Sequence, residues 1–238
     1  MKTQTTILML FFFGAVLPGY SYAQQSVPQE LIGTTYRSDS INLVYAQHKT
    51  LPRGYEKETL EALSHFPELQ NVPIRFAIRK SFSTLKTRPS FWSALMPKRH
   101  RTYTIIISNK TIEKLMPLMF NHLSYEARVG VIGHELSHVV YLSKKTTAQC
   151  FGILVGHLSA RYLDRFEYNT DMICIQHGLG KDLEAWSSYI RNTMHTSFWR
   201  GAGYVNKKNP GHERYMNPST IEKNIDTSNG RVLHINNN

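Results

Sequence analysis

The segment Val131–Val140, VIGHELSHVV, places two histidines and a glutamate inside an otherwise apolar run. Burying such polar side chains without partners costs several kcal/mol, so something inside the fold must compensate them. A metal ion is the first candidate. His134 and His138 lie four residues apart, so on a helix they are offset by only about 40° and both imidazoles can reach one point.

Glu135 completes an H-E-x-x-H arrangement, which supplies two nitrogen ligands for one zinc ion and a carboxylate that handles a water proton. Catalytic zinc also needs a third protein ligand. A third histidine six residues after His138 is excluded, because Lys144 stands there. A later helix supplies Glu167 as the third ligand, and Asp171, one turn further on, is expected to accept a hydrogen bond from a ligand histidine. The alternative for these two carboxylates is an ordinary solvated helix face.

Two stretches have the pattern of strands. Val72–Lys80 alternates between apolar and polar residues, with Pro73 at a strand start or a sheet edge, and Thr102–Ser108 is a second apolar strand. The connection between them, residues 81–101, is expected to form a solvated hairpin tip. Its Trp92 and its basic run Lys98–Arg101 are alternative substrate contacts.

Helical periodicity follows the strands along the chain. An earlier short helix is predicted over Tyr55–His65, and longer ones over Ser124–Leu142, Thr147–Leu158, Ser159–Gln176 with Gly178 as its stop, and Pro218–Ile225. His157 and His177 are expected to be helix histidines with ordinary hydrogen bonds. Strands first and helices afterwards predict an α+β fold.

The first residues have the pattern of a secretory signal peptide. Lys2 is the only charge before an apolar run from Ile7 to Leu17, and Ser21–Ala23 offers a small-residue cleavage site. The run is shorter than the ~20 residues of a membrane-spanning helix. We therefore expect residues 1–23 to be removed and the mature chain to be periplasmic or secreted, without stable membrane insertion.

The remaining chain is expected to form one domain over residues 51–225, between a loosely structured lead-in, 24–50, and a flexible tail, 226–238. Loss of Lys2 lowers the formal charge from +11 to +10. A basic exported protein tends to associate with acidic surfaces or peptides, whereas no nucleic-acid module is evident. The oligomeric state stays open.

Cys150 and Cys174 are the two cysteines of the chain. An oxidising compartment permits a disulfide between them, and two buried thiols on packed helices are the equal alternative.

H-E-x-x-H followed on a later helix by E-x-x-x-D resembles the gluzincin metallopeptidases. The segment Glu167–Asp171 is most similar to the Glu-x-x-Ala-Asp segment of the CAAX prenyl protease/HtpX family, with Thr170 in place of alanine. Asn217–Lys223 is similar to that family's His-Pro segment, but Asn217 replaces its histidine and Lys223 its arginine. The multi-pass membrane segments of those relatives are not found, so the resemblance implies a minimal, exported version. The lack of a Gly-x-Met-Glu-Asn segment favours an endopeptidase over an aminopeptidase.

The resemblance implies a zincin-like fold in which a small mixed or antiparallel sheet packs on the H-E-x-x-H helix and on a third-ligand helix. Residues 51–225 would then be the metallopeptidase domain. Zinc held by His134, His138 and Glu167 would lower the pKa of its water to about 7 and polarise the carbonyl of a peptide bond.

Glu135 would act as general base and then as general acid. The oxyanion needs a further donor, and the segment GHERYMNP offers His212, Arg214 and Tyr215, of which Tyr215 and His212 are favoured. A protein or peptide substrate would lie extended beside an edge strand, for which Thr102–Ser108 is the candidate.

Three functions are compatible with the sequence. The leading hypothesis is an exported zinc endopeptidase. A catalytically inactive, zinc-bound scaffold that captures peptides, as a chaperone would, is the second, and the presence of Glu135 argues against it. A binding protein without metal is the third, and Glu167 and Asp171 argue against that one.

Overall fold

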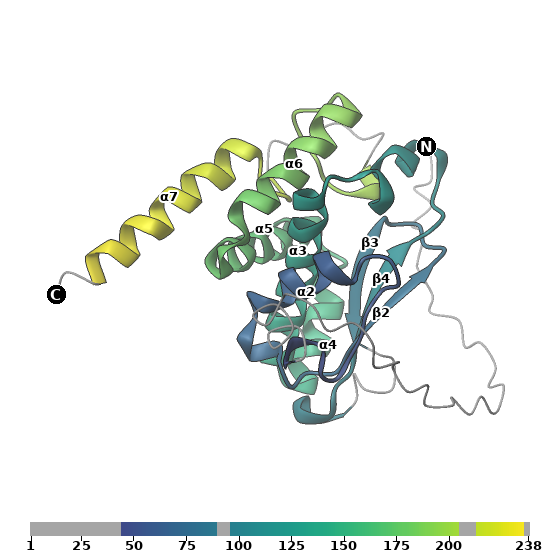
Figure 1. Ribbon diagram of the computed structural model, residues 1–238, viewed down its shortest axis with the longest axis vertical. Coiled ribbons are helices and arrows are strands. Elements are labelled where there is room, and N and C mark those ends of the chain that lie inside the picture. Colours follow the sequence, from purple (N-terminus) through teal and green to yellow (C-terminus); the bar gives the residue numbers. More distant parts are fainter. Residues whose placement is uncertain (1–43, 90–95, 205–212, 236–238) are drawn as a thin grey trace, which may run out of the picture. The chain divides into compact units, whose positions relative to one another are not determined.

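The computed structural model describes residues 44–89, 96–204 and 213–235. A four-stranded sheet runs in the order β1-β2-β4-β3. Figure 1 labels β2, β4 and β3, which lie side by side in that order. Its strands are β1 (Lys49–Thr50), β2 (Ile74–Arg79), β4 (Tyr103–Ser108) and β3 (Leu85–Pro89). The first three of these run parallel to one another, and β3 pairs antiparallel with β4. The fold is therefore α+β with a small mixed sheet, as the sequence predicted.

Two segments that were expected to be irregular contribute strands. β1 comes from the end of the lead-in 24–50, whose residues before 44 lie outside the described part. β3 comes from the connection 81–101, and Trp92 of that connection is also outside the described residues. Among the described strands, β3 pairs with β4 alone, so it lies at a sheet edge, where its final Pro89 is tolerated.

The prediction that Thr102–Ser108 forms an edge strand is wrong. β4 pairs with β2 on one side, where Tyr103 faces Ile74, and with β3 on the other, where Ile107 faces Leu85. All six residues of β4 are buried. Its run of β-branched residues is typical of a strand buried on both faces, but its second neighbour was not recognisable in the sequence.

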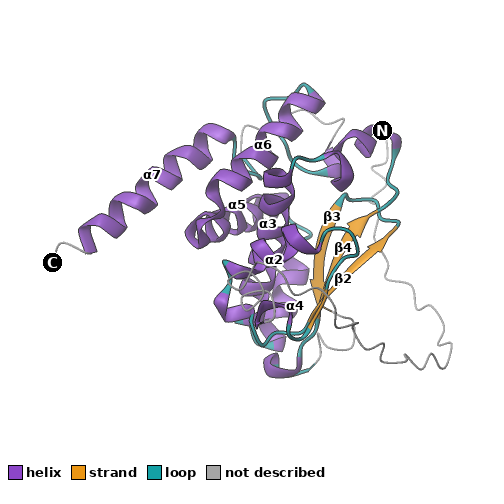
Figure 2. Ribbon diagram, in the orientation of Figure 1, coloured by secondary structure: helices purple, strands orange, loops and turns teal. Residues whose placement is uncertain are grey.

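The described residues include six longer α-helices. Figure 2 shows α2, α3 and α4 beside the sheet and α7 extending away from it. They are α2 (Glu56–Ser64), α3 (Tyr125–Ser143), α4 (Thr147–Gly156), α5 (Ala160–Cys174), α6 (Gly180–Met194) and α7 (Pro218–Ile235). The sequence predicted all of these except α6, and α7 extends ten residues beyond the predicted Pro218–Ile225. Among the described helices, none combines the length and the apolar character needed to span a bilayer.

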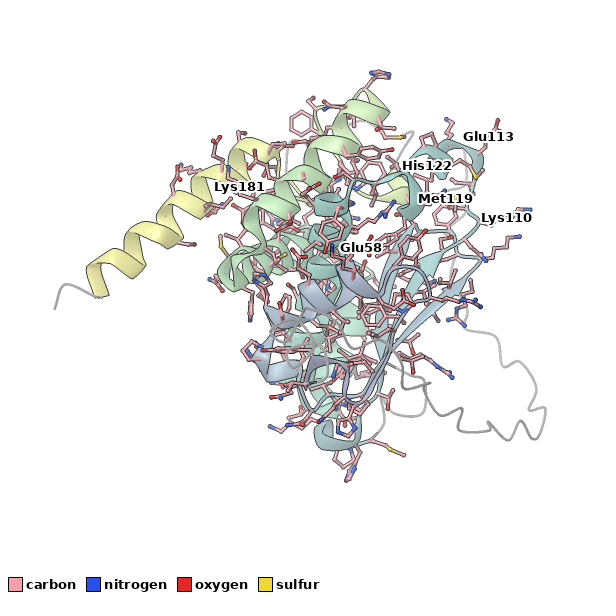
Figure 3. The ribbon with its side chains drawn as sticks, in the orientation of Figure 1. Glu58, Lys110, Glu113, Met119, His122 and Lys181 are labelled. Atoms are coloured by element: carbon pink, nitrogen blue, oxygen red, sulfur yellow. The ribbon has the colours of Figure 1, made fainter. Side chains whose placement is uncertain are left out.

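Helix α3 occupies the centre of the core and packs against α2, α5, α6 and β3. It begins after Ser124, whose hydroxyl accepts a hydrogen bond from the amide of Ala127 at 3.2 Å and so caps the start of the helix. Glu58 of α2, which Figure 3 labels, is buried against α3 by an ion pair with Arg128 at 3.0 Å. The histidine-bearing helix is therefore fixed on several sides.

Arg101 fixes the other end of α3. The basic run Lys98–Arg101 was expected to be solvated or to contact a substrate, but the Arg101 side chain is only 1% exposed. Its guanidinium donates to the carbonyl of Lys145 at 2.7 Å and to the hydroxyl of Thr147 at 3.1 Å. A cation at a helix C-terminus interacts favourably with the terminal carbonyls. Arg101 therefore joins α3 to α4.

The turn between α5 and α6 contains Gly178 with a φ of 83°, so α5 ends near the predicted stop and α6 begins two residues later. Cys174 at the end of α5 is buried, Cys150 of α4 is half-buried, and both are free thiols. Of the two alternatives for the cysteines, the structure has thiols on packed helices.

Helices α3 and α6 approach closely at Gly130. A Cβ atom at this position would lie 2.1 Å from the backbone carbonyl oxygen of Asp182, far inside van der Waals contact. Backbone cannot yield as a flexible side chain can, so this crossing requires glycine.

We expect Gly130→Ala to lower the free energy of unfolding by about 1–3 kcal/mol, because the overpacking outweighs the gain of about 1 kcal/mol in helix propensity. Urea denaturation measures this change. Gly152→Ala in α4 is the matched control, because a Cβ atom there meets nothing within 4 Å, and it should leave stability unchanged or raise it. Equal stabilisation by both changes would contradict the close α3–α6 contact.

Candidate metal centre

Helix α3 places His134 and His138 side by side in the interior. Their side chains are buried, and their ring centroids lie 4.8 Å apart with nearly perpendicular planes. The spacing of four residues brings both rings to the same helix face. His134 and His138 therefore share one face of α3, as their spacing predicted.

Helix α5 brings Glu167 to the two imidazoles. Its Oε2 atom lies 3.3 Å from Nε2 of His134 and 3.2 Å from Nε2 of His138. The three ligand atoms all lie within 4.8 Å of one another, so this group could hold a metal ion. Glu167, twenty-nine residues after His138, therefore lies where the sequence predicted a third ligand.

Asp171 orients His134 from behind. Its Oδ1 lies 2.7 Å from Nδ1 of His134, and its Oδ2 accepts a hydrogen bond from the backbone amide of Met216 at 2.7 Å. A carboxylate only accepts, so Nδ1 of His134 carries the proton and Nε2 presents a lone pair toward Glu167. Asp171 lies where the sequence predicted it, behind a ligand histidine.

Thr170 orients His138 in the same way, and the sequence analysis did not foresee this role. The Thr170 hydroxyl donates to the carbonyl of Phe166 at 2.9 Å, so its lone pairs face Nδ1 of His138 at 3.2 Å. Nδ1 of His138 therefore donates to Thr170, and its Nε2 is also a free lone pair. The sequence feature that could have indicated this role is the spacing of Thr170, which follows Glu167 by three residues and therefore shares its helix face.

When both imidazoles are neutral, two lone pairs and a carboxylate oxygen thus face one another in a buried site. Oε2 of Glu167 forms no hydrogen bond within the described residues, although both imidazole nitrogens lie close to it. Three acceptors at such distances repel one another unless a cation lies among them. The donor set and its second layer of hydrogen bonds fit a metal ion.

The pKa values of His134 and Glu167 also show that a positive charge is favoured between these side chains. Burial alone would lower the pKa of His134, but Asp171 and Glu167 outweigh it and raise that pKa to about 10. Burial likewise would raise the pKa of Glu167, but the charges of His138 and His134 hold it well below its ordinary value. A proton and a metal ion therefore compete for one position.

Glu135 lies on α3 next to the ligands without belonging to the triad. Its side chain is buried, and its Oε2 has no hydrogen-bond partner within the described residues. Its backbone carbonyl accepts a hydrogen bond from the hydroxyl of Thr87 at 3.1 Å, which ties β3 to the centre. A buried carboxylate without a partner is costly in free energy, and such groups mark sites where a ligand or water is handled.

Tyr215 packs against the ligand His134. The two ring centroids lie 5.5 Å apart, and Trp186 of α6, which the sequence analysis did not single out, lies 5.5 Å from His134 and 5.8 Å from Tyr215. Burial and then the charges of Glu167 and Glu135 raise the pKa of Tyr215 well above its ordinary value. Its hydroxyl is therefore a protonated donor at neutral pH.

The segment that carries Tyr215 is held by arginines. Arg191 of α6 donates to the carbonyl of Tyr215 at 3.0 Å, and its Nε donates to Asn217 at 2.6 Å. Arg214 pairs with Asp164 of α5 at 2.9 Å, so its guanidinium is committed to the fold. His212, the other predicted donor, lies outside the described residues.

A cavity of about 310 Å³ opens next to the metal ligands. Phe166 stacks on the ring of His138 at 5.1 Å and lines this cavity together with Thr170. Other lining residues are Tyr141, Tyr162, Arg161 and Arg165. The centre therefore has space beside it, with aromatic walls and two arginines.

The other two histidines considered in the sequence have ordinary helix contacts. Nδ1 of His157 lies 2.7 Å from the carbonyl of Ile153, and Nδ1 of His177 lies 2.7 Å from that of Ile173. Neither belongs to the metal-ligand group, as expected.

We expect the wild-type protein to bind one zinc ion per chain and Asp171→Asn to bind it about 10–100-fold more weakly. Asparagine cannot accept from both His134 and Met216, so the imidazole loses its fixed orientation. Competition titration with a chromophoric chelator measures the affinity. Glu68→Gln is the matched control, because Glu68 pairs with His177 at 3.0 Å away from the centre. Equal affinities of the wild type and Asp171→Asn would contradict the orienting role.

Comparison of the chain with protein-family models, with curated proteins and with solved structures finds no match. The candidate metal centre is therefore defined by the distances, burial and hydrogen bonds of its own residues.

Proposed function

We propose that the protein is an exported zinc-dependent endopeptidase that hydrolyses peptide bonds in proteins or peptides. The observation that carries this proposal is the cluster of facing acceptors formed by His134, His138 and Glu167, with the buried carboxylate of Glu135 beside it. The resemblance of these motifs to the gluzincin metallopeptidases supports the same reading.

Zinc is the metal that the donor set favours. Tetrahedral zinc with bonds of about 2.0–2.1 Å to nitrogen and oxygen keeps its ligand atoms about 3.3 Å apart. The carboxylate oxygen of Glu167 lies 3.3 and 3.2 Å from the two imidazole nitrogens. Two imidazoles and one carboxylate also leave a fourth position for water or substrate, as in catalytic rather than structural zinc sites.

A zinc ion bound here would polarise the carbonyl of the peptide bond and make a water acidic enough to attack it. Glu135 is the group that takes the proton from that water and then delivers it to the leaving amine. Its burial without a hydrogen-bond partner in the described residues leaves the carboxylate available for this transfer. The hydrogen bond from Thr87 to its backbone carbonyl positions this turn of α3.

Tyr215 supports the tetrahedral intermediate. A protonated phenol next to the ligand His134 can donate a hydrogen bond to the oxyanion, and the raised pKa of Tyr215 keeps its proton in place. Arg191 holds the backbone of this residue, so the donor is positioned before the substrate arrives.

β3 takes the role of the substrate strand in place of β4. It is the sheet edge that touches the H-E-x-x-H helix, through Thr87 and the carbonyl of Glu135. An extended peptide could pair with its free edge and so run past the ligands. The cavity lined by Phe166 and Tyr162 then provides space for one substrate side chain.

We expect Glu135→Gln to retain full zinc content but to lower kcat on casein about 10²–10⁴-fold, because the general base is lost while the ligands remain. Zinc content and casein hydrolysis are measured on the same preparations. Glu126→Gln, an exposed glutamate on the same helix, is the control and should retain wild-type activity. Full zinc with no hydrolysis by the wild type would point instead to an inactive peptide-binding scaffold.

We expect Tyr215→Phe to lower kcat about 10²–10³-fold with little change in KM or zinc content, since the donor acts on the transition state. Steady-state kinetics on a fluorogenic peptide separate these parameters. Tyr189→Phe is the control, because its hydroxyl bonds only the carbonyl of Pro117 on the surface, at 2.9 Å. Unchanged kcat in Tyr215→Phe would remove the residue from the mechanism.

A further inference from the structure

Helix α4 turns an apolar face outward. Phe151, Leu154, Val155 and Leu158 are 67%, 54%, 51% and 83% exposed, whereas Ile153 on the opposite face is buried. The spacing of three and four residues puts the exposed side chains on a single stripe of the helix and the turn that follows it. Exposed apolar side chains that cluster in this way mark an interaction surface.

The stripe is part of a rigid element. Thr146 and Gln149 form a reciprocal capping box at the start of α4, with hydrogen bonds of 3.2 and 2.9 Å. The guanidinium of the buried Arg101 donates a hydrogen bond to the hydroxyl of Thr147 in the first turn of α4. Met96, whose carbonyl accepts from Thr147 at 3.4 Å, is 46% exposed and enlarges the apolar surface.

The surroundings of this face are positively charged. Residues 146–159 contain no charged side chain, and residues 136–163 contain no aspartate or glutamate. Lys144 and Lys145 precede the helix, and Arg161 and Arg165 follow it on α5, with three of these four side chains exposed and Lys145 half-buried. An apolar stripe with lysines before it and arginines after it along the chain complements a surface that is apolar inside and anionic outside.

We propose that α4 docks the protein on the surface of an anionic lipid membrane. Phe151, Leu154, Val155 and Leu158 enter the boundary between headgroups and acyl chains, while the flanking lysines and arginines contact lipid phosphates. A helix of ten residues is about 15 Å long, half of the hydrocarbon thickness, so α4 lies in the plane of the membrane.

A second copy of the chain fits this face less well. In a twofold contact the same surface meets itself, so Lys144 would approach the cations of the other copy, as would Arg161 and Arg165. Like charges at an interface disfavour association, and no carboxylate between residues 136 and 163 relieves them. Anionic lipid supplies the opposite charge along the whole border.

The test measures co-sedimentation of the mature chain, residues 24–238, with vesicles of phosphatidylcholine alone or with a third of the lipid replaced by phosphatidylglycerol. We expect the wild type to prefer the anionic vesicles and Phe151→Ser/Leu154→Ser to bind them at least about 10-fold more weakly. Lys144→Glu/Arg161→Glu should lose the preference for anionic lipid. The apolar run Ile7–Leu17 is absent from each of these proteins, so it cannot bind the vesicles in place of α4.

Ile112→Ser/Met116→Ser is the matched control, because these side chains are 39% and 44% exposed in another part of the fold, and it should bind as the wild type does. Equal binding by Phe151→Ser/Leu154→Ser and the wild type overturns the proposal. So does a wild-type protein that binds anionic vesicles no more strongly than vesicles of phosphatidylcholine alone. A lipid-free dimer that this variant dissociates in sedimentation equilibrium also overturns it, since the face then joins two copies. Zinc content and thermal unfolding confirm that each variant is folded.

Discussion

The mutual approach of two imidazole nitrogens and one carboxylate oxygen is the constraint on which the site depends. Each atom is an acceptor in the neutral imidazoles and the carboxylate, and the carboxylate oxygen lies only 3.2 and 3.3 Å from the two nitrogens, which is unfavourable without a positive charge among them. Asp171 and Thr170 hold the Nδ1 protons of His134 and His138, so each ring, when neutral, presents the lone pair of its Nε2. The hydrogen bonds behind the ligands thus create the demand for a cation.

The same contacts couple the centre to the rest of the chain. Asp171 accepts from the amide of Met216, so the carboxylate that orients His134 also positions the segment that carries Tyr215. Arg191 holds the carbonyl of Tyr215 from α6, and Gly130 lets α6 approach the histidine helix closely. A change in α6 is therefore transmitted to the candidate ligands both through Trp186, which contacts His134, and through these hydrogen bonds.

Local patterns in the sequence were sufficient to predict the relative positions of site residues that lie on the same helix. The spacing of His134 and His138 and the position of Asp171 relative to Glu167 follow from helical periodicity alone. The edge strand could not be predicted, because whether β4 has one neighbour or two is decided by β3, whose residues carry a weak strand pattern. The contact of Trp186 with His134 was equally hidden, since it depends on how α6 packs.

Helix α4 shows where an apolar pattern misleads. Its composition is that of a core helix, yet only Ile153 of its residues is buried, because α3 already fills the interior. The exposed stripe and the carboxylate ligand are parts of one continuous stretch, with Leu158 preceding α5 and Glu167 two turns inside it. Nine residues of helix span about 13 Å, so docking of α4 would hold the metal ligands within that distance of a membrane surface. Peptides anchored at or emerging from a bilayer would then meet the centre more often than peptides in bulk solution, because confinement near the surface raises their local concentration.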